Sequence, residues 1–73
     1  MTTKITYTIP ERGNVSLKVF DLLGSEVREL VKGEVEAGEY EINFDASLLP
    51  SGVYFYQLKA ESFIEAKKML LIK

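Results

Sequence analysis

The feature that most constrains this fold is the alternation of apolar and polar residues in short runs separated by turn-forming residues. Residues 5–9, 15–19 and 40–44 each alternate with a period of two, which is typical of strands with one buried face. Residues 53–60 form a further apolar and aromatic run. No loop is long enough for the crossover that parallel strands require. The pattern therefore predicts an all-β fold, an antiparallel β-sandwich of six or seven short strands.

Two segments are harder to assign from periodicity. Residues 26–32 fit a strand or a helix, and the tight connection expected at residues 21–24 favours a strand that returns antiparallel. Residues 33–38 are expected to form an acidic loop.

The segment 45–49 is predicted to make one short helical turn. Asp45 would be its N-cap, and Leu48 and Leu49 would close an open end of the core.

The strand periodicity also predicts which side chains are buried. The expected core consists of Ile5, Tyr7, Val15, Leu17, Val19, Tyr40, Ile42, Phe44, Tyr54, Tyr56 and Leu58. Residues 54–56 could alternatively stack sugars or bases, but a central strand requires the same aromatic pattern and core packing is favoured. Phe20 and Phe55 fall on the opposite face, and together they would form an exposed apolar patch that marks an interaction surface.

The composition argues against catalysis. The 73-residue chain has no histidine and no cysteine, so it lacks the commonest general base and any thiolate or disulfide. Its net charge of −2 offers no attraction for nucleic acid or anionic membranes. No apolar run approaches the roughly 20 residues of a spanning helix. We therefore expect a non-enzymatic module with no cofactor, no resident metal, no nucleic-acid partner and no membrane insertion.

An acidic stretch at residues 34–45 allows two interpretations. Its carboxylates could coordinate Ca²⁺, which takes six to eight oxygen ligands. The stretch lacks an Asp-x-Asp-x-Asp-Gly loop, however, and a solvated acidic face is favoured.

The end of the chain combines apolar and basic residues. Residues 69–72 are apolar on both faces of a strand, and lysines precede them at positions 59, 67 and 68. Such a strand can add to the edge of another sheet, where backbone pairing supplies affinity. It can also be covered by a homodimer or by strand swapping.

At this point the chain resembles a known family, the C-terminal sorting domains of type IX secretion cargo. The resemblance spans nearly all 73 residues and depends on five segments in a fixed order. These segments are residues 3–10 (TKITYTIP), 15–27 (VSLKVFDLLGSEV), 37–42 (AGEYEI), 49–58 (LPSGVYFYQL) and 67–73 (KKMLLIK).

The resemblance implies a single domain over residues 1–73, an immunoglobulin-like sandwich without catalytic activity. Such a domain carries an N-terminal passenger through the periplasm to the outer-membrane translocon, where a sortase-like protease removes it. The passenger is then secreted or held at the cell surface. By position, the sorting signal and its partner-binding residues would be Gly52, Tyr54, Lys68, Met69, Leu70, Leu71, Ile72 and Lys73.

The chain departs from the family pattern at its beginning. Met1 stands where the family has an Asn-Pro-aromatic segment, so we expect Met1 to be an artificial start that lies after the passenger and the cleavage region. The alternative function is an immunoglobulin-like accessory module of a secreted protein. Such a module would bind carbohydrate or protein, or would resemble the domain of flagellar hook caps.

Overall fold

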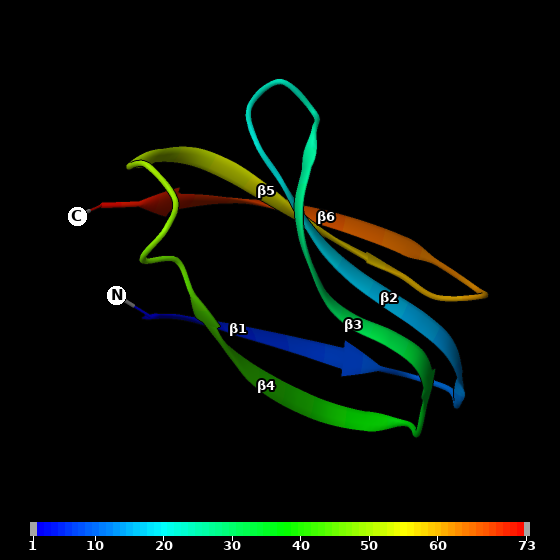
Figure 1. Ribbon diagram of the computed structural model, residues 1–73. Coiled ribbons are helices and arrows are strands. Elements are labelled where there is room, and N and C mark those ends of the chain that lie inside the picture. Colours follow the sequence, from blue (N-terminus) through cyan, green and yellow to red (C-terminus); the bar gives the residue numbers. More distant parts are fainter. Residues whose placement is uncertain (1, 73) are drawn as a thin grey trace.

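The computed structural model describes residues 2–72, which form six β-strands and no helix (Figure 1). The strands are β1 (Thr2–Ile9), β2 (Gly13–Phe20), β3 (Glu26–Val35), β4 (Gly38–Asp45), β5 (Gly52–Lys59) and β6 (Ile64–Leu71).

The strands make two antiparallel sheets that lie over one another. One sheet contains only β1 and β4, and the other has the order β3-β2-β5-β6. The all-β antiparallel sandwich expected from the sequence is confirmed, with six strands. Its two sheets differ in width, so the smaller one covers only part of the larger one.

The core lies between the sheets and follows the alternation along each strand. Its fully buried members are Ile5, Ile9, Val15, Leu17, Val19, Phe44, Ala46, Tyr54, Leu58 and Leu71. Four residues expected in the core are only half-buried at its margin, and these are Tyr7, Tyr40, Ile42 and Tyr56. The difference arises because the narrow two-stranded sheet leaves its own Tyr7, Tyr40 and Ile42 near open sides and covers Tyr56 on β5 only in part.

The ambiguous segment 26–32 is a strand, as favoured. The turn before it is held by Asp21, whose Oδ1 accepts hydrogen bonds from the backbone N–H groups of Leu23 and Ser25, both at 2.9 Å. Gly24 adopts a φ of 87°, which a residue without Cβ takes at no steric cost. The prediction of an acidic loop over residues 33–38 was wrong in part, because β3 continues to Val35 and only residues 36–37 connect it to β4.

The segment 45–49 forms a turn instead of the expected helical turn. Asp45 Oδ1 accepts a hydrogen bond from the Ser47 backbone N–H at 3.0 Å, and this bond is the main reason that the pKa of Asp45 is lowered. The Leu49 N–H donates to the Ala46 carbonyl at 3.0 Å. Ala46 fills the core here, whereas Leu48 is 87% exposed and does not close it. The N-cap signal was therefore real, but it stabilises an isolated turn.

Candidate functional site

The last strand, β6, lies at the edge of the four-stranded sheet and pairs only with β5 (Figure 1). Its residues alternate between the inner face, which looks toward the small sheet, and the outer face. Leu71 points inward and is 1% exposed, while its neighbour Leu70 points outward and is 61% exposed. Ile72 is exposed just beyond the strand, and Lys73 lies outside the described residues. The strand is therefore anchored on one face and apolar on its free face.

The structure brings together the two parts of the signal inferred from the sequence. In the β5–β6 ladder, Gly52 lies opposite Leu71 and Tyr54 lies opposite Met69. The buried Tyr54 donates a hydrogen bond from its hydroxyl to the Pro50 carbonyl at 2.8 Å. Gly52 has a φ of 155°, a conformation that L side chains rarely adopt. Both residues thus hold the beginning of β5 in place against the end of β6.

Phe20 and Phe55 lie directly opposite each other on β2 and β5, so the predicted pair forms, but neither ring is as fully exposed as expected. Both side chains are half-buried on the outer face. A shallow hollow of about 300 Å³ lies beside them and is bounded on the other sides by Leu22 and Ala66. The two phenylalanine rings therefore line the hollow together with Ala66 of β6.

Lys68 lies directly opposite Phe55 on the outer face of β6. Within residues 2–72 its side chain makes no ion pair. Its amine is exposed beside apolar surface and is available to a carboxylate of a binding partner.

Sequence analysis missed two surface leucines that extend this apolar area. Leu22 and Leu23 lie in the turn between β2 and β3, and they are 68% and 90% exposed. Only their place between Asp21 and Gly24, inside a turn, indicated that both would lie outside the core.

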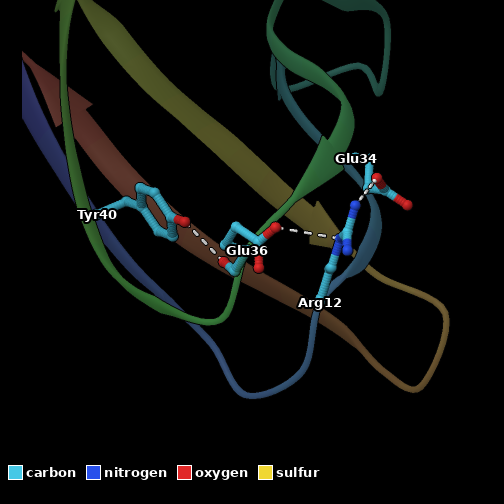
Figure 2. A network of polar contacts seen from close by, with 4 residues as sticks. All are labelled: Arg12, Glu34, Glu36 and Tyr40. Carbon is cyan, nitrogen blue, oxygen red and sulfur yellow. Dashed lines mark hydrogen bonds and ion pairs between the residues drawn. The ribbon is translucent and has the colours of Figure 1, made fainter.

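The acidic stretch is used for ion pairs near the other end of the molecule. Arg12 contacts Glu34 Oε1 at 2.6 Å and Glu36 Oε1 at 3.2 Å, and the Tyr40 hydroxyl donates to the Glu36 carbonyl at 2.6 Å (Figure 2). This network ties the turn between β1 and β2 to the connection between β3 and β4. No group of three or more potential ligand side chains that could hold a metal ion occurs among the described residues.

The part of the chain that the structure describes contains no helix that is long and apolar enough to cross a membrane. The geometry instead presents an edge strand, an outward apolar face and an unpaired lysine at one place. Edge strands and exposed apolar patches of this kind occur in surfaces that bind other proteins.

In a comparison with protein families, the family model of the secretion system C-terminal sorting domain matches residues 1–73. The chain belongs to this family. The searches of curated proteins and of solved structures found no match.

Membership establishes the general role of the sorting domain. It is a non-catalytic secretion signal of the type IX system, and the translocon machinery recognises it. A protein that carries it is secreted or targeted to the outer membrane. The sequence-based identification of the family and of its role as a signal is therefore confirmed.

Proposed function

We propose that the translocon machinery recognises the sorting domain through the outward side of β6, with Lys68, Leu70 and Ile72 as the contact residues. The observation that carries this proposal is the contrast between the buried Leu71 and the exposed Leu70 beside it. Because the strand is already anchored by its inner face, the exposed Leu70 side chain contributes favourable hydrophobic free energy only when a binding partner covers it. Lys73 would extend the same contact.

The edge position of β6 adds a second source of affinity. Because β6 pairs with one strand only, every other backbone N–H and C=O group along it is free to pair with a strand of the partner. Backbone pairing would supply affinity, and the outward side chains would supply selectivity. Met69, Leu71, Gly52 and Tyr54 would act indirectly, by holding β6 flat against β5.

The steps around this recognition follow from the family resemblance. The domain, residues 1–73, would follow an N-terminal passenger, accompany it through the periplasm, and be removed at the translocon by a sortase-like protease. The passenger would then be released or kept at the cell surface. None of these steps requires chemistry from the sorting domain itself.

Free β6 edges can also pair with each other. In the absence of the translocon, two copies of the chain would form a weak homodimer through this strand. Sedimentation equilibrium over a range of protein concentrations tests this, and a strictly monomeric chain at high concentration would contradict it.

The decisive experiment compares two residues on the same strand. Leu70 and Ile64 both point outward from β6, and each is 61% exposed. The chain is fused to the C-terminus of a periplasmic fluorescent protein in a bacterium with an active type IX system. Fluorescence outside the cell is then measured for the unaltered fusion, for Leu70→Ser and for Ile64→Ser.

We expect Leu70→Ser to retain the reporter in the periplasm and Ile64→Ser to be exported normally. The two changes remove comparable apolar surface, so a difference in export reports the location of the contact. Equal export of both variants, with both domains folded, would place the recognised surface elsewhere.

A further inference from the structure

An open cleft of about 660 Å³ lies between the two sheets, at the end of the molecule away from Leu71. One wall is the inner face of β6, where Glu65 lies opposite Leu58 and Lys67 lies opposite Tyr56. These inner positions would be core positions in a closed sandwich. The Glu65 and Lys67 side chains are nevertheless 55% and 58% exposed, because the small sheet ends at β1 and leaves them uncovered.

The opposite wall is aromatic. Tyr7 on β1 and Tyr40 on β4 are directly opposite each other, with ring centroids 5.4 Å apart and ring planes 15° from parallel. Tyr40 covers one face of the Tyr7 ring. Tyr7 is half-buried at the margin of the core and lines the cleft, so it offers aromatic surface to a ligand there.

The polar groups around this platform are not all satisfied. The Tyr40 hydroxyl donates to the Glu36 carbonyl (Figure 2), whereas the Tyr7 hydroxyl has no hydrogen-bond partner within the described part of the chain. Lys67 Nζ and Glu65 Oε1 are 3.4 Å apart, and as an exposed ion pair they keep free donor and acceptor capacity. Threonines 6 and 8 complete the rim.

We propose that this cleft binds a neutral or amine-bearing sugar ring. The C–H face of a pyranose is attracted to the electron-rich face of an aromatic ring, and its hydroxyl groups can bond with a carboxylate and an amine at the same time. The cleft volume lies in the ordinary range for small-ligand sites, about 300–1,000 Å³. This site is separate from the outward side of β6 and does not depend on the proposed route of recognition.

The charge of the cleft selects among sugars. Glu39, Glu41 and Glu65 line it, and Lys67 is its only lysine or arginine among the described residues. Glu65 pairs with Lys67 and Glu41 pairs with Lys4 outside the cleft, so Glu39 supplies the carboxylate that no ion pair within residues 2–72 offsets. Excess negative charge disfavours acidic sugars and phosphates and favours an amino group. The free edge of β1 could also attract an extended peptide, and the test distinguishes this from sugar binding.

The test follows the backbone amide signals of the 73-residue chain by NMR during titration with three disaccharides. These are cellobiose, a glucosamine disaccharide and a glucuronic acid disaccharide. We expect the first two to shift the signals of Tyr7, Leu58, Glu65 and Lys67 with a dissociation constant of about 1 mM. The acidic disaccharide should bind at least about tenfold more weakly.

The chain provides a matched control for the lysine. Lys4 forms a similar exposed ion pair with Glu41, and its side chain is 60% exposed, but Lys4 does not line the cleft. Lys67→Ala should weaken binding about tenfold, and Lys4→Ala should leave it unchanged. Tyr7→Val should abolish binding. If that variant unfolds, the comparison of Lys67→Ala with Lys4→Ala still tests the proposal.

Three results would overturn the proposal. The first is the absence of shifts from the neutral and amino sugars at tens of millimolar. The second is equal binding by the Lys67 and Lys4 variants. The third is slower hydrogen exchange along β1 when a threonine-valine peptide is added, with no response to sugars, which would make the cleft a strand-binding groove.

Discussion

The two halves of β6 have the same backbone pairing and opposite surroundings. Near its end, the inner side chains of Met69 and Leu71 lie over a sealed core, and Leu71 is almost inaccessible. Near its beginning, the inner side chains are Glu65 and Lys67, and both face water. Both halves pair with β5 without interruption, so backbone pairing does not determine which inner side chains of β6 are buried. Their burial depends on whether the second sheet and its connections cover them.

The inward-facing cations show the same contrast. At the sealed end the Arg28 guanidinium lies 5.6 Å from the centroid of the Phe44 ring, an arrangement that offsets part of its desolvation. At the open end the Lys67 amine stays solvated, so it has no desolvation to offset, and it forms an exposed ion pair with Glu65. The comparison teaches that a sandwich with sheets of unequal width has one end that carries stability and another that is free to interact.

The sharpest way to break this comparison is to remove the anchor of the sealed end. Leu71→Ala should lower the free energy of unfolding by about 2–5 kcal/mol, because it leaves a cavity among buried side chains. Leu70→Ala, at the neighbouring exposed position, should change it by no more than about 0.5 kcal/mol. Urea unfolding followed by circular dichroism measures both. Similar losses for the two variants would show that β6 is not anchored on its inner face.

A smaller effect is expected at Tyr54. Tyr54→Phe keeps the buried ring and removes only the hydrogen bond to the Pro50 carbonyl, so the loss should be about 1 kcal/mol. The same urea experiment measures it. A loss as large as that of Leu71→Ala would mean that the bond fixes the whole start of β5.

At the open end, removal of the Arg12 side chain should lower the stability of the domain by less than the changes above. Arg12→Ala removes two exposed ion pairs, each worth up to about 1 kcal/mol, and the effect should shrink as salt rises. Thermal unfolding at low and high salt checks this, with Lys4→Ala as the single-pair control. A salt-independent loss would contradict an electrostatic role.

The smallest effect is a dependence on alkaline pH. Burial and the neighbouring Tyr40 raise the pKa of Tyr7 in the folded chain. A raised pKa means that the unfolded chain loses this proton first, so stability is fully present below about pH 10 and decreases as the pH rises through the folded pKa. Tyr7→Phe should flatten this decrease. Unfolding measured between neutral and strongly alkaline pH tests the sign.

Much of the fold could be predicted because strand periodicity is local. Residues 5–9, 15–19 and 40–44 are strands at the positions where alternation was clear. The extension of β3 past Gly33 was not predictable from the glycine itself, since pairing with Val15 overrides its weak preference for strands. The helical turn and the burial of Leu48 were misjudged because a capping aspartate fits a helix and an isolated turn equally well, whereas Leu49 is half-buried against the core, as expected.

The candidate sites depend on pairings between distant segments, and this limits prediction. Lysines 67 and 68 are adjacent in the sequence, and both were interpreted as the basic part of the last strand, with Lys68 as the first residue of the proposed signal. Register with Tyr56 and Phe55 places them on opposite faces, one in the cleft and one on the outer surface. The cleft itself exists because β1 pairs with β4 alone, and no local pattern in either strand shows that a third strand is missing.

The edge strands of the two sheets also have a consequence for solubility. Each of the four outermost strands carries charged side chains, among them Lys4 on β1, Glu39 on β4, Lys32 on β3 and Lys68 on β6. Charges on edge strands oppose the edge-to-edge pairing of one sheet with the next, through which fibres can grow. The proposed recognition through β6 requires that strand to stay exposed, and these charges allow the exposure while they oppose polymerisation.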